Sequence, residues 1–298
     1  MGETPRRVGI RDLLRVAPDG PVDLAAIDPR STPGLPANRS TRTDPKTWSR
    51  EQVAALGPEL ATGQEMLYAG AKVNGDPRRL LLVLQAMDCG GKDGTVKRVA
   101  GTMNPQGLHI RGFEKPTPEE QKHHFLWRIR RALPAAGYIG VFNRSHYEDV
   151  LIVRVHDLVP ERTWSRRYGE INRFEAELVA EGFTLVKVML HISPAEQRER
   201  LMERLTDPTK YWKYNPADLD ERHRWADYQA AYADALTRCG TPDAPWYVVP
   251  ADRKWYRNWA IAHLLRETLA DLKLRYPEPG FDVAAERRRL AADQVKFP

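Results

Sequence analysis

The chain has 298 residues, of which 42% are hydrophobic, and its formal net charge is +6. This length suits one large α/β domain with terminal extensions or two small domains. No apolar run reaches the roughly 18 residues that a membrane-spanning helix needs. The N-terminus also lacks the apolar core of a signal peptide, so we expect a cytoplasmic protein with no membrane partner. Two cysteines, Cys89 and Cys239, exclude a disulfide framework and a multi-cysteine zinc site. The mildly basic charge is compatible with any polyanionic partner and does not distinguish among them.

Three regions of the chain differ in composition. Residues 1–45 are rich in proline and have little apolar periodicity, and they predict an extended arm that wraps or fringes the rest of the chain. Residues 46–277 predict the main domain, which opens with a long helix over 45–73 that Pro58 weakens. Residues 278–298 predict a charged and peripheral tail.

Within the main domain, short apolar runs alternate with amphipathic stretches. The runs predict strands over residues 80–84, 108–113, 138–143, 183–192 and 246–250. Thr117 and Ser193 predict helix starts, because each is followed by a proline and then by a glutamate that completes a capping box. Further helical segments are expected over 146–180 and 253–275. Strands that alternate with helices predict one parallel sheet covered by helices on both faces.

The loop after the first predicted strand is rich in glycine, in the segment LQAMDCGGKDGT (residues 84–95). Gly90, Gly91 and Gly94 allow backbone N–H groups to turn inward toward an anion, and Lys92 supplies a charge for a bridging phosphate. The position of the loop between a buried strand and a helix is the one that phosphate binding requires. The alternative is a glycine-rich turn that binds no ligand.

Two positions of this loop differ from the usual phosphate-binding pattern. Ala86 stands where the first glycine belongs, and Asp93 stands where a serine or threonine would hold magnesium. Thr95 is one turn into the helix and could bond a phosphate, and Asp88 offers a carboxylate for a metal.

The third predicted strand ends in the polar segment NRSHYED, where open α/β sheets place their chemistry. Asn143 stands where an aspartate would organise magnesium, and Arg144 is placed to neutralise charge on a transferring phosphoryl group. Glu148 and Asp149 lie one turn further on. An ordinary surface loop with a salt-bridged arginine is the alternative.

A basic and aromatic insertion, residues 206–220, follows the helix that opens at Ser193. Its composition suits a mobile flap that excludes water and adds cationic donors over phosphates. An amphipathic helix with a solvated basic face would have the same composition. Lys97 and Arg98, in the helix after the glycine-rich loop, either extend a cationic track from Lys92 or are exposed helix residues.

Four segments in order resemble the signatures of the second family of polyphosphate kinases: LQAMDCGGKDGT, FNRSHYEDVL, DPTKYWKYNPADL and APWYVVPADRKW. The resemblance implies a thymidylate-kinase-like P-loop fold of about five strands, with a helical lid over about residues 198–220. In that family, glycine or alanine occurs at the position of Ala86, and aspartate or glycine occurs at the position of Asp93. It also implies a loop that grips inorganic polyphosphate, a nucleotide bound opposite, dependence on Mg²⁺ (or Mn²⁺), and a homo-oligomer, either a tetramer or a dimer.

The resemblance also implies roles for individual residues. Asp88 is expected to hold the metal or to orient the acceptor, and Glu148 is expected to hold the metal. The expected catalytic residues are Asp88, Lys92, Asn143, Arg144 and Glu148. The expected polyphosphate contacts are Gly90, Gly91, Lys92, Asp93, Gly94, Thr95, Lys97, Arg98, Arg204, Lys210 and Lys213. The expected nucleotide contacts are Phe113, Thr117, Arg128, Asn143, Arg144 and Glu148.

The expected reaction is reversible phosphoryl transfer from polyphosphate to AMP and ADP, giving ADP and ATP. Asn143 and Glu148 resemble the subgroup (class III) that phosphorylates both nucleoside mono- and diphosphates. One alternative is an ATP-dependent nucleotide kinase. Another is a non-catalytic protein that binds polyanions tightly and without turnover, with a strong dependence on salt. Nucleic acid is not an expected partner.

Overall fold

Five parallel strands form one sheet in the computed structural model, which describes residues 8–17, 20–36 and 44–294. The strand order is β2-β3-β1-β4-β5, so β1 occupies the centre. The strands are β1 Arg79–Ala86, β2 Leu108–Gly112, β3 Ile139–Asn143, β4 Phe183–His191 and β5 Trp246–Pro250. The predicted parallel sheet is confirmed, and each strand lies where its apolar run predicted it.

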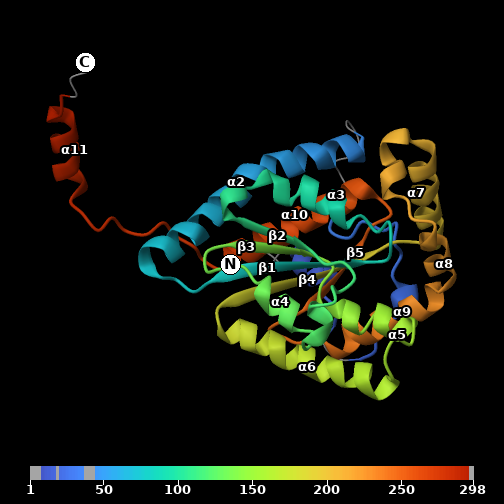
Figure 1. Cartoon of the computed structure of the whole chain (residues 1–298). Coiled ribbons are helices and arrows are strands. Elements are labelled where there is room, and N and C mark those ends of the chain that lie inside the picture. The colour runs from blue at the N-terminus through green and yellow to red at the C-terminus, as the bar shows by residue number, and fades with distance from the viewer. Residues whose placement is uncertain (1–7, 18–19, 37–43, 295–298) are drawn as a thin grey trace, which may run out of the picture.

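Helices cover both faces of the sheet. The α-helices of the main domain are α2 Pro45–Asn74, α3 Lys92–Arg98, α4 Trp127–Arg131, α5 Ile152–Val155, α6 Glu161–Ala180, α7 Pro194–Thr206, α8 Ala217–His223, α9 Trp225–Arg238 and α10 Lys254–Asp271. In Figure 1, α2, α3 and α10 lie over one face, and α4 and α6 lie over the other. Helices α7 and α8 stand beyond the carboxyl ends of the strands. No helix among the described residues combines the length and apolarity that crossing a bilayer requires.

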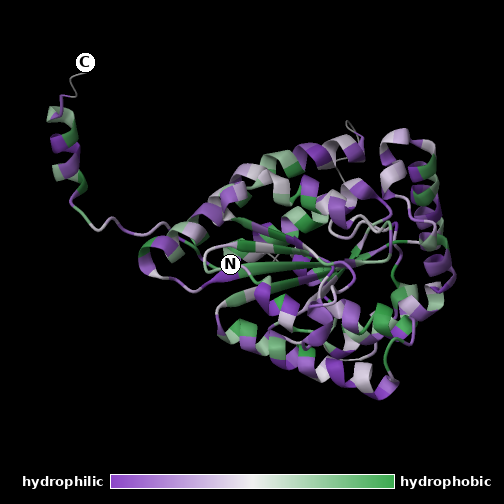
Figure 2. Cartoon of the chain, in the orientation of Figure 1, coloured by the Kyte–Doolittle hydropathy of each residue, from purple (hydrophilic) through white to green (hydrophobic). Residues whose placement is uncertain are grey.

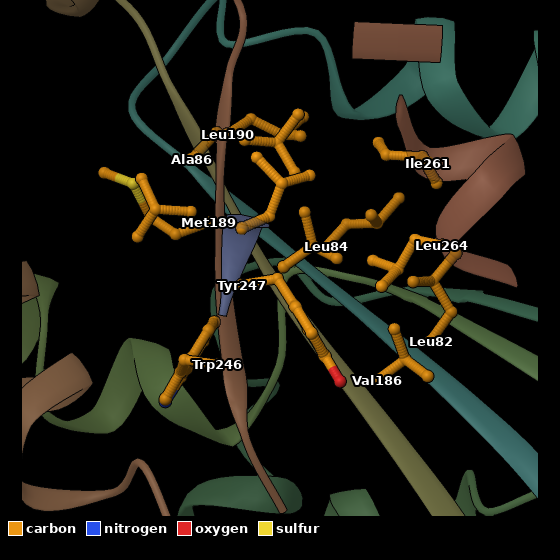
Figure 3. Packing of buried hydrophobic residues seen from close by; sticks show 14 of the residues in the cluster. Leu82, Leu84, Ala86, Val186, Met189, Leu190, Trp246, Tyr247, Ile261 and Leu264 are labelled. Carbon is orange, nitrogen blue, oxygen red and sulfur yellow. The ribbon is translucent and has the colours of Figure 1, made fainter. Parts of the chain in front are cut away.

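Alternate side chains of β1 point to opposite faces of the sheet and build a core on each. Leu82 lies beside Ile261 and Leu264 of α10 (Figure 3), while Val83 packs on the other face with Phe174 of α6. Figure 2 shows the result, apolar strands between helices whose outer surfaces are largely polar. Each fully buried aliphatic side chain contributes about 1.5–3 kcal/mol, so the central strand is held firmly from both sides.

Helix α2 runs without interruption through Pro58, which the sequence analysis expected to weaken it. A proline inside a helix removes one backbone hydrogen bond and strains the preceding turn. Leu56, Leu60 and Leu67 are buried along this helix, and α2 packs lengthwise on α10. Burial of this apolar side of the helix outweighs the local cost of the proline.

The helix that the capping box at Thr117 predicted forms only in part. The two reciprocal hydrogen bonds between Thr117 and Glu120 are present, at 2.9 and 3.2 Å. The helix nevertheless ends after the 3-10 turn Glu120–Lys122, because His123 adopts an extended backbone with φ −109° and ψ 166°. A separate helix, α4, then begins at Trp127. The predicted helical region 146–180 is likewise divided, into the 3-10 turn His146–Asp149, α5 and α6.

The described part of the N-terminal arm lies along the outer edge of the sheet. Arg15 pairs with Tyr247 of β5 in an antiparallel bridge, and Val16 donates its N–H to the carbonyl of Trp246 at 2.9 Å. The arm also buries apolar side chains, among them Leu14 and Leu24. Since an exposed edge strand invites pairing with other chains, the arm protects β5.

The C-terminal tail contains a helix, α11 Val283–Ala292, that has no buried residue. It stands apart from the domain in Figure 1.

A buried ion pair lies between β4 and α6. Lys187 Nζ donates to Glu175 Oε2 at 2.5 Å and to the hydroxyl of Tyr147 at 2.9 Å. Burial would raise the pKa of Glu175, but Lys187 and His146 outweigh it and the pKa is lowered. The pair therefore anchors the 3-10 turn His146–Asp149 to the sheet.

We predict that Lys187→Met destabilises the protein by about 3–5 kcal/mol, because it leaves the Glu175 carboxylate buried without its ammonium partner, with only Tyr147 and His146 beside it. In the wild type, the lowered pKa of Glu175 means that its contribution is lost as the pH falls through that pKa. In the variant burial raises the pKa, so stability should instead increase as the pH falls. Urea unfolding between pH 3 and 8 measures both effects, and Lys187→Met/Glu175→Leu is the control that restores most of the loss. A variant within about 1 kcal/mol of the wild type at pH 8 would contradict the prediction.

Candidate active site

The glycine-rich loop lies at the carboxyl end of the central strand and leads into α3. Lys92, the first residue of α3, is buried, and its Nζ donates to the carbonyl of Ala86 at 2.9 Å. Burial lowers the pKa of Lys92, and the positive charge of Arg144 lowers it further. Carboxylates at Asp88, Glu148 and Asp93 act in the opposite direction. The ammonium group is thus held at the base of the loop amid both cations and carboxylates.

Close packing explains Gly90 in this loop, and backbone conformation explains Gly91. A Cβ at Gly90 would lie 2.3 Å from the Cβ of Ala86, which no side chain tolerates. Gly91 has φ +102° and caps α3 in a left-handed conformation. The N–H of Gly90 donates to the carbonyl of Met87 at 3.0 Å, so this predicted donor is used within the loop.

The loop after β3 faces the glycine-rich loop. Arg144 has φ +63°, and its N–H donates to the carbonyl of Leu84 in β1 at 3.0 Å. Its Nη2 lies 3.3 Å from Asp88 Oδ1. Burial lowers the pKa of Arg144, but the carboxylates of Glu148 and Asp88 outweigh it and the pKa is raised. The guanidinium stays charged where a transferring group would need neutralisation.

Asp93 connects both loops to the lid. Its Oδ1 accepts from Asn143 Nδ2 at 2.7 Å, and its Oδ2 lies 3.6 Å from Lys213 Nζ. The carboxylate at the position where other phosphate loops carry a hydroxyl therefore joins three segments of the site.

Glu148 lies in the 3-10 turn after β3. With the amide of Gln85 turned to satisfy its neighbours, its nitrogen donates to Glu148 Oε1 at 3.0 Å. Burial raises the pKa of Glu148, while Arg144 and Lys92 partly offset that effect. The negative charge of Asp88 raises the pKa too, so the two carboxylates repel each other in this structure.

The lid residues form the opposite wall of a cavity of about 800 Å³. Arg204 donates to the carbonyl of Lys213 at 2.8 Å and pairs with Asp218 at 3.1 Å. Lys210 Nζ lies 2.6 Å from Glu203 Oε1, and the other oxygen of Glu203 pairs with Lys254 at 3.0 Å. One carboxylate thus holds two of the cations that face the cavity.

On the side of β2, Phe113 packs edge to face on Phe142, with ring centroids 4.9 Å apart. The buried Arg128 donates to the carbonyl of Glu114 at 2.8 Å and lies 5.6 Å from the Phe113 ring. Thr117 is exposed and engaged in its capping box. The structure therefore brings Phe113 and Arg128 together, and it links Thr117 to Arg128 through Glu120, whose Oε2 accepts from the N–H of Thr117 at 2.9 Å and lies 3.7 Å from Arg128 Nη1.

Most of the predicted site residues line this one cavity. Those that do are Asp88, Gly90, Gly91, Lys92, Asp93, Gly94, Arg98, Phe113, Asn143, Arg144, Arg204, Lys210 and Lys213. Those that stand behind or beside the lining are Thr95, Lys97, Thr117, Arg128 and Glu148. Thr95 is buried and donates its hydroxyl to the carbonyl of Gly91 at 3.2 Å, whereas Lys97 is exposed.

Two arginines of the cavity wall were not among the expected catalytic and binding residues, although Arg200 falls within the lid expected over about residues 198–220. Arg200 donates to the carbonyl of Cys89 at 2.8 Å and pairs with Glu196 at 2.7 Å. Arg257 of α10 lies directly on the loop, where a Cβ at Gly91 would be 1.7 Å from its Nη1. The Glu-to-Arg spacing in α7 pointed to a helical ion pair at Arg200, but nothing local in the sequence connects α10 to the loop.

Asp88 and Glu148 form a donor set that fits a small divalent cation. Their charges act on each other and on the same lysine. Mg²⁺ is commonly bound by one or two carboxylates together with substrate phosphates. No group of three or more His, Cys, Asp or Glu side chains that could hold a metal occurs among the described residues.

A central parallel strand, a glycine-rich loop with a buried lysine, an opposing arginine and a cationic lid define a P-loop kinase-like phosphotransferase. A family model described as "Polyphosphate kinase 2 (PPK2)" matches residues 46–277. The chain belongs to the polyphosphate kinase 2 family.

Individual relatives are similar over most of the chain. The AMP/ADP-polyphosphate phosphotransferase of Meiothermus ruber is 44% identical over 273 residues, 92% of this chain and 97% of that protein. The ADP-polyphosphate phosphotransferase of Rhodopseudomonas palustris is 41% identical over 80% of this chain and 86% of its own length. The crystal structure of polyphosphate kinase 2 from Arthrobacter aurescens TC1 superposes with a TM-score of 0.90 at 47% identity, covering 96% of this chain and 98% of that one.

We predict that Glu203→Gln strengthens the binding of inorganic tripolyphosphate about two- to fivefold, because it removes a negative charge from the cavity wall, frees Lys254 from Glu203 and leaves Lys210 paired with Asp207 alone. Titration calorimetry at low and moderate salt measures the change, which should shrink as salt screens the cations. The control is Glu199→Gln, an exposed position on the same helix. Equal affinities for Glu203→Gln and the control would show that Glu203 does not restrain these lysines.

Proposed function

We propose that this protein transfers a phosphoryl group between inorganic polyphosphate and adenine nucleotides, forming ADP from AMP and ATP from ADP. The observation that carries the proposal is the placement of Lys92 and Arg144 on facing loops of one cavity that a cationic lid covers. The names of the Meiothermus and Rhodopseudomonas relatives support the same reaction.

The chain's own residues contribute mainly position and charge. Backbone N–H groups of the loop and Lys92 hold the phosphates of the donor in place. Arg144 lies opposite and stabilises the charge that spreads over the transferring group. The lid, through Arg204, Lys210 and Lys213, covers the chain and excludes water that would otherwise compete as acceptor. Because donor and acceptor are held in line, their reaction becomes effectively unimolecular within the bound complex and needs no chance encounter in solution.

Asp88 and Glu148 would hold Mg²⁺ once substrate is bound. When present, the ion neutralises phosphate charge and fixes the geometry of the phosphates. Asn143 is neutral, so it adds no third carboxylate charge to the set, and it is hydrogen-bonded to Asp93 instead. Metal binding therefore rests on Asp88 and Glu148.

The acceptor lies on the side of β2 in this proposal. Phe113 is largely buried but lines the cavity on this side, and Arg128 stiffens the segment through the carbonyl of Glu114. The two relatives differ in the acceptors that their names state, AMP and ADP in one and ADP in the other. Asn143 and Glu148, together with the Meiothermus relative, support use of both acceptors. We further propose a homo-oligomer, a tetramer or a dimer, and a cytoplasmic location where these nucleotides occur.

The first test is incubation of the protein with Mg²⁺, polyphosphate and AMP, with the nucleotides separated over time. We expect ADP to appear first and ATP to follow. Conversion of ADP alone would keep polyphosphate as the donor and restrict the acceptor. Transfer only from ATP would favour an ATP-dependent nucleotide kinase, and tight binding without any product would favour a polyanion-binding protein.

We predict that Arg144→Ala lowers kcat by about 10²- to 10⁴-fold while the KM for the nucleotide changes less than about threefold, because the arginine acts on charge that develops during transfer. Steady-state kinetics with ADP and polyphosphate measure both constants. Arg98→Ala is the comparison, since that residue is exposed at the cavity rim and should affect the KM for polyphosphate. If Arg144→Ala raised KM and left kcat intact, its role would be binding.

A further inference from the structure

Arg257 is a buried cation without a carboxylate partner among the described residues. Its side chain lies in the first turn of α10, and the residue is 3% exposed. Its Nε and Nη2 both donate to the neutral amide oxygen of Asn258, at 3.1 and 2.9 Å. Burial lowers the pKa of Arg257 to about 9, and the nearby charge of Arg200 contributes to the decrease.

Arg200, which lines the same cavity, is by contrast an arginine whose guanidinium nitrogens all have hydrogen-bond acceptors. It is 6% exposed, pairs with Glu196 at 2.7 Å, and donates to the carbonyls of Cys89, Ala251 and Asp252 at 2.6 to 3.0 Å. Every branch of that guanidinium has an acceptor. Arg257 has one neutral acceptor and a neighbouring cation, so folding alone does not explain why it is there.

The guanidinium of Arg257 lies against the glycine-rich loop itself. A Cβ at Gly91 would be 1.7 Å from Nη1, and a Cβ at Gly94 would be 2.8 Å from Nη2. Two glycines of the loop therefore leave room for this side chain as well as for a ligand. Arg257 also lines the cavity that contains Lys92 and Arg144.

An unpaired buried cation is costly to keep, and the cost falls when an anion arrives beside it. The cavity is where the proposed function places the phosphates of the donor. We propose that Arg257 is a donor-binding residue whose counter-charge is the phosphate chain itself. Polyphosphate bound at the glycine-rich loop then neutralises the buried charge of Arg257. This inference rests on the proposed function.

Two opposite effects follow for a neutral substitution. Without ligand, removing Arg257 should leave the protein as stable as before or more stable, because an uncompensated charge disappears. With ligand, the same substitution should weaken donor binding, because a charge-assisted hydrogen bond to phosphate is lost. A residue with a merely structural role would show the reverse, lower stability and unchanged donor binding.

The experiment compares the wild type with Arg257→Gln, Arg257→Lys and the control Arg78→Gln. Arg78 pairs with Asp76 at 2.5 Å and donates to the carbonyl of Leu272, and it is not among the residues that line the cavity. Tm is measured without ligand and with inorganic tripolyphosphate in the absence of nucleotide, and KM is measured for polyphosphate and for ADP.

For Arg257→Gln we expect a ligand-free Tm equal to or above that of the wild type, and tripolyphosphate binding weakened about 10- to 100-fold. The KM for polyphosphate should rise by a similar factor, and the KM for ADP should stay within about twofold. The tripolyphosphate affinity of Arg257→Lys and its KM for polyphosphate should fall between those of the wild type and Arg257→Gln, because lysine keeps the charge and lacks the planar guanidinium. Arg78→Gln should lower Tm and leave the response to tripolyphosphate intact.

A lower ligand-free Tm for Arg257→Gln with unchanged tripolyphosphate affinity would overturn the inference and leave the proposed function standing. Equal increases in both KM values would do the same, since they would indicate general damage to the site. A wild type that neither binds tripolyphosphate nor uses polyphosphate would overturn the proposed function, and this inference with it.

Discussion

The parallel pairing of β1 with β3 is the constraint on which the geometry of the site depends. Leu84 lies opposite Asn143 in the register of the two strands, and the next N–H, that of Arg144, donates back to the carbonyl of Leu84. Strand β3 therefore ends opposite Leu84 while β1 continues to Ala86, and the loops that follow the two strands face each other across the cavity. Any slip in this pairing would separate the lysine loop from the arginine loop, and with it the two charges that phosphoryl transfer requires.

The strands and the two loops could be predicted because their signals are local. Each strand is a short apolar run, and the loop around Lys92 combines glycines with a lysine in a spacing that has a direct mechanical meaning. The capping box at Thr117 was also read correctly as hydrogen bonds. The helix that it opens is only one 3-10 turn long, because the backbone is extended at His123. Leu126 and Ile129 reach the core from the segment that follows.

Other features depend on contacts between distant segments and leave no local trace. Pro58 was expected to weaken the long helix, yet the packing of α2 on α10 keeps the helix continuous through it. Arg257 looked like one of many basic residues in a C-terminal helix, and its approach to Gly91 appears only after the sheet and α10 have assembled. The cations of the lid were recognised from composition, whereas the carboxylate of Glu203, which restrains two of the cavity's lysines, was not.

The arm along β5 has a consequence for where the functional unit begins. The family match starts at residue 46, but Leu14 and Leu24 are part of the core and Arg15 completes the sheet edge. A fragment trimmed to the matched range would uncover an apolar strip and would leave the backbone carbonyl of Trp246 on β5 without its partner from the arm. Such a fragment would carry every residue of the cavity and still be prone to self-association, so the shortest well-behaved version of this enzyme is longer than its catalytic motifs suggest.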